Sequence, residues 1–378
     1  MKTFDVAIAG GGLIGGSIAL ELARAGLRVG LFDRQEPGLE ASWASAGILS
    51  PAPESPAMIG MVPLGKASMA LYPEFAQMVE ELSSQSVGYR AKGTLEIVTS
   101  RYAREELSTI IALHHGLGLK AEPLSAADAR ELEPNLREDI EAAVLRPAEA
   151  SVDNRSLTRA IVLSARKSGV EVFANQRVEK IWREGDICEG LITSTEKVSA
   201  KHTVIAAGCF SAQIQGVEQY APVVPAKGQM ISLRCAQARI ERVLWGDEIY
   251  LVPRNDGRVL AGATVEYAGF DKTLTAGGQR KLLNAAIDLV PAFEKAQVEE
   301  AWAGLRPDSP DHLPILGSTD LQGLIIATGH FRSGVLLTPV TARLIREWIT
   351  LENVSLQWDR FSPMRFEAAR KQTHARAN

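Results

Sequence analysis

The stretch Phe4-Asp-Val-Ala-Ile-Ala-Gly-Gly-Gly-Leu-Ile-Gly15 decides the fold of this chain. Its first half, Phe4 to Ala9, is apolar enough for a buried strand, and apolar residues from Ile14 to Ala25 recur at helical spacing. Gly26 follows as a residue that ends a helix, and Arg28 to Asp33 forms a second strand. The order strand, helix, strand predicts two parallel strands of an α/β domain.

The glycines of this stretch form a Gly-x-Gly-x-x-Gly pattern, called the fingerprint below. Such a pattern binds dinucleotides when it joins a strand to a helix. Gly10 permits a tight turn, Gly12 lets a pyrophosphate approach the backbone, and Gly15 lets the helix pack closely. The free N–H groups of the helix N-terminus attract phosphates. Asp33 follows Gly15 by 18 residues and can accept hydrogen bonds from a ribose. Glycines that serve packing alone are the alternative, but spacing, flanking pattern and acidic residue all favour a nucleotide. The pattern does not by itself separate FAD from NAD.

The remaining pattern predicts one domain assembled from separated pieces, with a second domain inserted into it. An irregular region at 35–65 precedes a helix at 68–83, and the stretch 221–265 is rich in strands. A strand at 323–328 and a helix at 339–351 return to the α/β rhythm. Further strands are predicted at 93–99, 170–173, 201–207, 230–233, 249–252 and 258–262, and further helices at 105–113, 126–132, 154–168 and 282–290.

Composition excludes several classes of function. The 378 residues are 46% hydrophobic and carry a net charge of −4 without a basic cluster, so nucleic acid is not expected as a partner. Three cysteines without a CxxC pair favour a reducing, cytoplasmic compartment, and no HExxH or similar pattern indicates a metal site. The uncharged stretch from Val6 to Leu20 holds five glycines, and it is too short to span a membrane.

Three further stretches carry a resemblance to a known family. They are Ala41-Ser-Trp-Ala-Ser-Ala-Gly-Ile-Leu49, Trp302-Ala-Gly-Leu-Arg-Pro307 and Gly329-His-Phe-Arg-Ser-Gly-Val-Leu-Leu337. They resemble motifs of the glycine oxidase branch of the D-amino-acid oxidase (DAO) family of FAD-dependent oxidoreductases, the branch that serves thiamine biosynthesis. The resemblance extends over nearly the whole chain, and the last two motifs are its most specific parts.

The resemblance implies a p-hydroxybenzoate hydroxylase-like architecture of the α/β class. A Rossmann-like FAD-binding domain with a parallel sheet would comprise 1–84, 145–220 and 305–378. An interleaved, β-rich substrate-binding domain would comprise 85–144 and 221–304. Relatives of this branch also imply a homo-oligomer, a tetramer.

By the same resemblance the chain binds FAD noncovalently, since the last motif contains no cysteine. The residues around Ser42 would follow the flavin and pyrophosphate, Val178 would contact the adenine side, and Ser333 to Leu336 would meet the pyrimidine edge. The cofactor-binding residues implied by the fingerprint and the resemblance are Gly10, Gly12, Leu13, Ile14, Gly15, Asp33, Arg34, Ser42, Ala44, Ser45, Ala46, Gly47, Val178, Gly208, His330, Arg332, Ser333, Gly334, Val335 and Leu336.

Four residues match substrate positions of the family. Arg306 would pair with a substrate carboxylate, Tyr250 would contact the same carboxylate, and Arg332 would lie near the amine or the flavin edge. Leu49 stands where some relatives have methionine, which affects the shape of the pocket. Two alternatives remain from the residues themselves: Arg306 as a surface ion-pair residue and Tyr250 as a core aromatic.

The chemistry explains why these residue types are suited to an amine oxidase. Oxidation of an amino acid moves a hydride from the α-carbon to flavin N5, so the protein mainly orients the substrate. A guanidinium holds a carboxylate in two parallel bonds. No catalytic base is assigned, and His330 is expected to be a packing residue. Thr338 is predicted to cap a helix that begins with Pro339 and directs its positive end at the flavin.

The predicted reaction converts glycine, sarcosine or a small D-amino acid to an imine. Water then releases glyoxylate and ammonia, O₂ yields H₂O₂, and a thiazole synthase is an alternative consumer of the imine. One rival function is a dehydrogenase or oxidase of a bulkier or N-substituted amino acid, which peroxide yield would distinguish. The other rival is a non-catalytic flavin-binding protein, whose flavin no amine would bleach under nitrogen.

Overall fold

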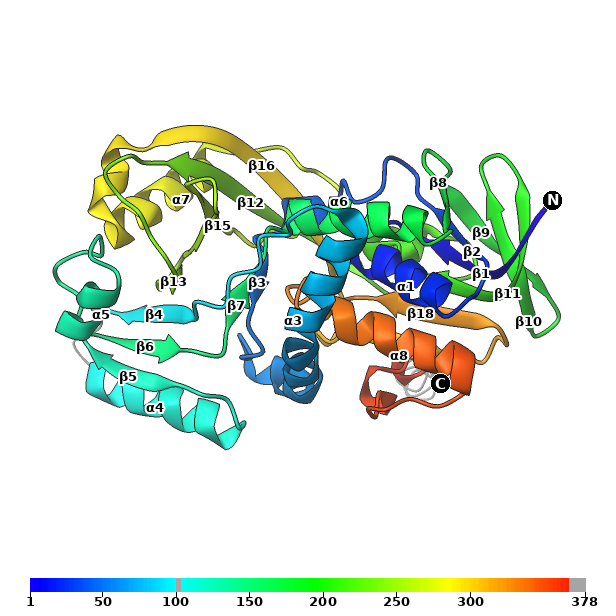
Figure 1. Ribbon diagram of the computed structural model, residues 1–378, viewed down its shortest axis with the longest axis horizontal. Coiled ribbons are helices and arrows are strands. Elements are labelled where there is room, and N and C mark those ends of the chain that lie inside the picture. The colour runs from blue at the N-terminus through cyan, green and yellow to red at the C-terminus, as the bar shows by residue number, and fades with distance from the viewer. Residues whose placement is uncertain (100–102, 367–378) are drawn as a thin grey trace, which may run out of the picture.

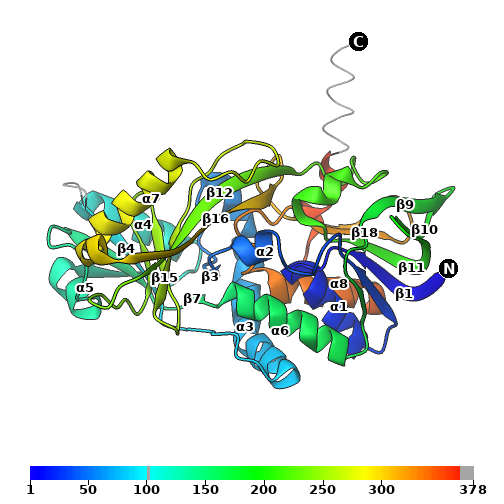
Figure 2. The ribbon, with the colours of Figure 1, turned by 90° about the horizontal axis from the view of Figure 1, so that it is seen from above.

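Two β-sheets at opposite ends of the molecule organise the computed structural model, as both views show (Figures 1 and 2). The structure describes residues 1–99 and 103–366. The predicted α/β class is therefore confirmed, with the fingerprint in the first sheet and the strand-rich stretch in the second.

The first sheet is built around β1 (Lys2–Ala9), which pairs in parallel with β2 (Val29–Phe32) on one side and β11 (Lys197–Ile205) on the other. Its strand order is β17-β18-β11-β1-β2-β8, and a β9–β10 hairpin is attached to β11. All pairings along that order are parallel except that of β17 with β18. The remaining strands are β8 (Glu171–Phe173), β9 (Val178–Glu184), β10 (Ile187–Thr193), β17 (Ile315–Ser318) and β18 (Leu324–Thr328).

Helices cover one face of this sheet. Helix α1 (Leu13–Arg24) packs against α6 (Asn154–Lys167) and α8 (Thr338–Leu351), and α3 (Val62–Ser83) packs on the last two. Ile18 of α1 is fully buried in the apolar core that these helices share with the sheet. The opposite face forms a second apolar core with the β9–β10 hairpin.

The second sheet has the order β16-β12-β15-β14-β13-β4-β6-β5. Helices α5 (Ala126–Leu132) and α7 (Ala276–Leu289) pack on one of its faces, and the other face turns toward α2 (Ala41–Ala44). Helix α4 (Ala103–Gly116) packs beside its last strands. The strands are β4 (Thr94–Val98), β5 (Glu122–Ser125), β6 (Ala142–Arg146), β12 (Val224–Arg234), β13 (Val243–Trp245), β14 (Tyr250–Pro253), β15 (Arg258–Gly262) and β16 (Gln297–Asp308).

The structure corrects the predicted elements in two places. The region 35–65 is not irregular throughout, because it contains α2, the short strand β3 (Ile48–Leu49) paired with β7 (Ala150–Ser151), and a 3₁₀ turn at Pro56–Met61. Helix α3 begins at Val62, several residues before the predicted start. Besides β3, the strands that were not predicted are β5, β6, β7, β9, β10, β13, β16 and β17. The first three residues of β16 are exposed, and Val298 is the one apolar residue among them, so the start of this strand has no apolar run.

The domain boundaries stay a prediction. Strands β6 and β16 run through two of them, at 144/145 and 304/305, and residues 367–378 of the last segment lie outside the described residues. Within 1–99 and 103–366, no helix has both the length and the apolar character needed to cross a bilayer. Over the same ranges, no group of three or more His, Cys, Asp or Glu side chains is placed to hold a metal ion.

Replacement of Gly15 by alanine tests how closely α1 approaches β1. A Cβ at Gly15 would lie 1.9 Å from the carbonyl oxygen of Gly10, so α1 has to shift. We expect Gly15→Ala to lower the free energy of unfolding by more than about 2 kcal/mol in urea titrations.

Gly277→Ala is the matched control, because a Cβ at this position of α7 would meet no atom within 4 Å. Its free energy of unfolding should stay the same or rise by up to about 1 kcal/mol, since alanine favours helix over glycine. Equal effects of the two substitutions would contradict the close packing of α1.

Candidate active site

One elongated cavity of about 620 Å³ collects the fingerprint and the three resemblance motifs. Nineteen of the 20 predicted cofactor residues line its wall, Gly15 being the exception. Tyr250, Arg306 and Arg332 line it as well. Segments that are far apart in the sequence therefore meet at one site between the two sheets.

The nucleotide end is formed by the turn after β1. A Cβ at Gly12 would lie 2.9 Å from the Ser42 Oγ, so this part of the wall accepts only glycine without a shift. The backbone N–H of Leu13 donates to the same Oγ at 2.9 Å, which joins the second motif to the start of α1. Gly15 itself packs against the turn behind the wall, which is the role that the sequence predicts for it.

Asp33 lies at the carboxyl end of β2 and faces the turn. Its carboxylate accepts the N–H of Gly11 at 2.7 Å and that of Gln35 at 3.0 Å. Burial raises the pKa of this carboxyl group, and the two backbone N–H groups oppose that rise. Each carboxylate oxygen keeps a lone pair for a further donor, so Asp33 can still accept a ribose hydroxyl. A glycine-only approach and a half-buried acceptor are features that suit the ADP half of FAD.

Residues 333–336, between β18 and α8, form another part of the cavity wall, which we call the 333–336 wall. Two side chains of α3 bind this segment from behind: the Ser68 hydroxyl donates to the Leu336 carbonyl at 2.5 Å, and the Tyr72 hydroxyl donates to the Val335 carbonyl at 3.0 Å. The N-terminus of α8 directly follows this wall. Its predicted cap is wrong, because Leu337 occupies the cap position and Thr338 is the first helical residue, with its hydroxyl donating to the Gly334 carbonyl at 2.8 Å.

The end of the cavity that is expected to hold the substrate, called the substrate end below, lies against the second sheet. Arg306 on β16 lines the cavity, with its guanidinium so close to Gly228 of β12 that a Cβ there would lie 2.3 Å from Nη1. Arg306 Nη1 also donates to the carbonyl of Thr264 at 3.3 Å. The guanidinium is therefore held inside the cavity, and the surface alternative for Arg306 does not describe this structure.

Tyr250 lies on β14, with its hydroxyl 3.4 Å from the Met230 sulfur. Burial raises the pKa of its phenol, against an opposing effect of the nearby Arg306, so the hydroxyl stays protonated and can donate. Arg332 forms an ion pair with Glu54, and burial lowers the pKa of its guanidinium.

The structure corrects the prediction that Leu49 lines the substrate pocket. It is fully buried in the core beneath the first sheet and pairs with Ala150, and its neighbours Ile48 and Ser50 line the cavity instead. Successive side chains of a strand point to opposite faces, so a shift of one residue exchanges wall and core. At the end of this motif, Ile48 and not Leu49 therefore lines the cavity.

The sequence reading also missed three residues of the substrate end. Trp245 pairs with Tyr250 across the β13–β14 hairpin, with ring centroids 5.3 Å apart, and the Gly246-Asp247 turn was the available signal. Glu96 on β4 and Arg146 on β6 form an ion pair in the cavity wall. These two residues lie far apart in the sequence, and no local pattern connects them.

His330 is held as a neutral packing residue. It is 3% exposed, its Nε2 lies 3.1 Å from the Thr341 hydroxyl, and burial lowers its pKa to about 3. This agrees with the expectation that it packs.

Comparisons with known proteins agree with the motifs. The family model described as "DAO: FAD dependent oxidoreductase" matches residues 5–348. Glycine oxidase of Geobacillus kaustophilus is 32% identical over 363 residues, which cover 95% of this chain and 96% of that protein. The crystal structure of the Geobacillus kaustophilus enzyme superposes with a TM-score of 0.91 at 31% identity, over 97% of this chain and 99% of that one.

Two other relatives differ in organisation and in name. The "Bifunctional protein ThiO/ThiG" of Trichormus variabilis is 35% identical over 369 residues, which cover 97% of this chain but 55% of that protein. The chain thus spans about half the length of this bifunctional relative. Iminodiacetate oxidase from Chelativorans sp. BNC1 superposes with a TM-score of 0.85 at 28% identity, over 95% of this chain and 98% of that one.

The pKa of His330 makes a prediction about stability. The unfolded chain binds a proton at this histidine near pH 6.5 and the folded chain only near pH 3, so stability falls as the pH drops through that window. Between about pH 3 and pH 6.5, we expect His330 alone to change the free energy of unfolding by up to about 1.4 kcal/mol per pH unit. Above pH 6.5 it should contribute no slope.

Urea unfolding at several pH values between these limits measures the slope. In His330→Gln, which cannot titrate, the fall in stability should be smaller by that amount. Identical slopes in the two proteins would show that His330 takes up a proton in the folded chain.

Proposed function

Because the chain belongs to the DAO family of FAD-dependent oxidoreductases, we propose that it is an oxidase of glycine or another small amine, such as sarcosine or a small D-amino acid. With glycine the products would be an imine, which water converts to glyoxylate and ammonia, and H₂O₂ from O₂; other amines would give the corresponding oxo acid and amine. FAD supplies the acceptor for the hydride of the α-carbon. The chain's own residues bind the substrate and orient it.

The observation that carries this proposal is the Arg306 guanidinium inside the cavity. A guanidinium can hold a carboxylate by two parallel charge-assisted bonds, which fixes the position of the α-carbon. The protonated hydroxyl of Tyr250 lines the same end of the cavity and adds a donor for that carboxylate. Positioning of this kind can lower a barrier by about 7–11 kcal/mol in favourable cases.

No side chain is assigned as a base at carbon. A neutral amine can lose a hydride directly, and the neutral His330 faces Thr341. Arg332, paired with Glu54, is proposed to lie beside the amine or the flavin edge.

The residues of the cavity fit noncovalent FAD. Gly12 and Ser42 would hold the pyrophosphate, Asp33 the ribose, and the segments 44–47 and 333–336 the flavin ring. Cys209 also lines the cavity, but burial raises the pKa of its thiol to about 12. A thiol with so high a pKa is a poor nucleophile for attachment to the ring.

A second candidate function is oxidation of an N-substituted amino acid. The likeness to an iminodiacetate oxidase supports it. The ratio of kcat/KM for iminodiacetate to kcat/KM for glycine would distinguish this candidate, and the yield of H₂O₂ per amine oxidised would show whether O₂ is the electron acceptor. The fused relatives support a further part of the proposal, namely that a thiazole synthase consumes the imine. Assembly into a homo-tetramer likewise remains a proposal.

Replacement of Arg306 by alanine tests the carboxylate assignment. Loss of two charge-assisted bonds of about 1.5 kcal/mol each should raise the KM for glycine by at least about 100-fold. Steady-state kinetics with glycine measure the KM. The KM of Arg306→Lys should lie between those of the unaltered protein and Arg306→Ala, because lysine keeps the charge but loses the paired donors.

Arg183→Ala is the control for the loss of a positive charge, because Arg183 lies on the exposed part of β9. Its KM for glycine should equal that of the unaltered protein. An Arg306→Ala protein with an unchanged KM would refute the role of Arg306.

A further inference from the structure

The short helix α2 and the residues that follow it form the cavity wall expected along the flavin. A helix of four residues leaves its carbonyl groups without partners inside the helix. The wall continues through Ser45, Ala46 and Gly47, and Gly47 has a φ of +74°, with its carbonyl accepting the N–H of Val152 at 2.8 Å. The position of this wall therefore depends on what binds its remaining carbonyls.

Side chains from three distant elements bind four of these carbonyl groups. Asn154 Nδ2 donates to the carbonyls of Ser42 at 2.8 Å and Trp43 at 2.9 Å. Trp302 Nε1 donates to the Ala44 carbonyl at 2.9 Å, and Arg254 Nη2 donates to the Ala46 carbonyl at 2.7 Å. We call Asn154, Arg254 and Trp302 the carbonyl clamp.

The clamp is buried and internally connected. Its residues are 1%, 7% and 5% exposed in the order given. Arg254 Nη2, which donates to the Ala46 carbonyl, also donates to Asn154 Oδ1 at 2.9 Å. The amide of Asn154 therefore links two carbonyls to the guanidinium. Burial lowers the pKa of Arg254 to about 10, which leaves it charged near neutral pH. A buried carbonyl that loses its donor costs about 1–3 kcal/mol, so each bond restrains the wall.

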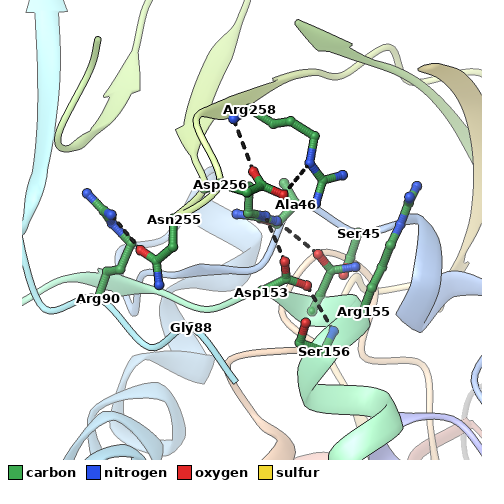
Figure 3. A network of polar contacts seen from close by, with 12 residues as sticks. Ser45, Ala46, Gly88, Arg90, Asp153, Arg155, Ser156, Asn255, Asp256 and Arg258 are labelled. Carbon is green, nitrogen blue, oxygen red and sulfur yellow. Dashed lines mark hydrogen bonds and ion pairs between the residues drawn. The ribbon is translucent and has the colours of Figure 1, made fainter. Parts of the chain in front are cut away.

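Figure 3 shows how this network is anchored. Asp153 caps α6 by accepting the N–H of Ser156 at 2.9 Å, and its carboxylate lies 3.8 Å from Arg254 Nε. Arg155, which follows Asn154 in α6, donates from Nε to the Trp43 carbonyl at 3.3 Å, and its guanidinium lies 3.7 Å from the centroid of the Trp43 ring. The start of α6 thus places Asn154 against α2.

None of the three clamp residues lines the cavity, among the residues that the structure describes. They come from the first turn of α6, the β14–β15 turn and β16, so the clamp ties both sheets to one segment. The 333–336 wall is held in the same way. Ser68 donates to the carbonyl of residue 336, and Tyr72 donates to that of residue 335. In both walls the carbonyls are bound from outside the cavity.

We propose that Asn154, Arg254 and Trp302 are positioning residues for the flavin, which act by fixing the carbonyls of residues 42–46 and thereby the wall that faces the ring. This inference rests on the proposed FAD site. It assigns to three residues outside the cavity an effect on the affinity and the electronic environment of the flavin.

The test uses the full-length protein with FAD. Asn154→Leu removes the two donated bonds and the accepted one with little change in volume, and the dissociation constant of FAD should rise by at least about tenfold. Trp302→Phe removes one donor and keeps an aromatic ring, so a rise of about threefold to tenfold is expected. Flavin fluorescence measures both constants, and the visible spectrum and reduction potential of the bound flavin should shift with them.

Ser164→Ala is the matched control. It removes a buried hydroxyl that donates to the Val79 carbonyl at 3.4 Å. Ser164 lies on the same helix α6, about three turns further along than Asn154. Its FAD constant, flavin spectrum and reduction potential should equal those of the unaltered protein.

The result that overturns the inference is a pair of folded clamp variants with unchanged FAD constants, spectra and potentials. If Asn154→Leu does not fold, Trp302→Phe alone decides in the same way. An unaltered protein that binds no FAD would instead refute the proposed flavin site, and the inference with it.

Discussion

The contact between the start of α1 and the end of β1 is the constraint on which the site depends. The Cβ position of Gly15 lies 1.9 Å from the Gly10 carbonyl, and that of Gly10 lies 2.4 Å from the Ala206 carbonyl after β11. Both contacts leave room only for hydrogen. They bring the N-terminus of α1 to the carboxyl edge of the first sheet, where α/β proteins bind nucleotides. Asp33 then reaches the same turn from β2.

The second sheet supplies the other side of the cavity because its two faces differ. One face packs on α5 and α7 through residues such as Leu95 and Ile231, which form an ordinary apolar core. The other face presents Tyr250 and Met230 to the cavity, and Arg306 is placed over Gly228 by the register of β12 with β16. The face that turns toward the first sheet therefore supplies the Arg306 guanidinium and the Tyr250 hydroxyl to the cavity. Both walls that would flank the flavin are restrained through their carbonyls, which keeps the cavity shape independent of any single loop.

Features that depend on neighbouring residues in the sequence were predictable, whereas features that depend on contacts between distant segments were not. The β1–α1–β2 unit and helix α5 follow from local periodicity, and α5 has the predicted bounds. Strand β16 carries the Arg306 motif but was missed as a strand, because its exposed start has no apolar run. Leu49 was assigned to the pocket by its resemblance to a family position, but its side chain lies in the core and that of Ile48 lines the cavity. The Glu96–Arg146 pair and the carbonyl clamp depend on contacts between distant segments, and such contacts leave no local pattern in the sequence.

The proposed function is the oxidation of small amines that carry a carboxylate, with FAD in the cavity between the two sheets. The most direct test mixes the flavin-loaded protein with a panel of amines under nitrogen and follows the visible absorption of the flavin. Glycine, sarcosine and D-alanine should bleach the flavin, whereas methylamine, which has no carboxylate for Arg306, should leave it yellow at the same concentration. A flavin that no carboxylated amine bleaches, or that methylamine bleaches equally well, would contradict the account.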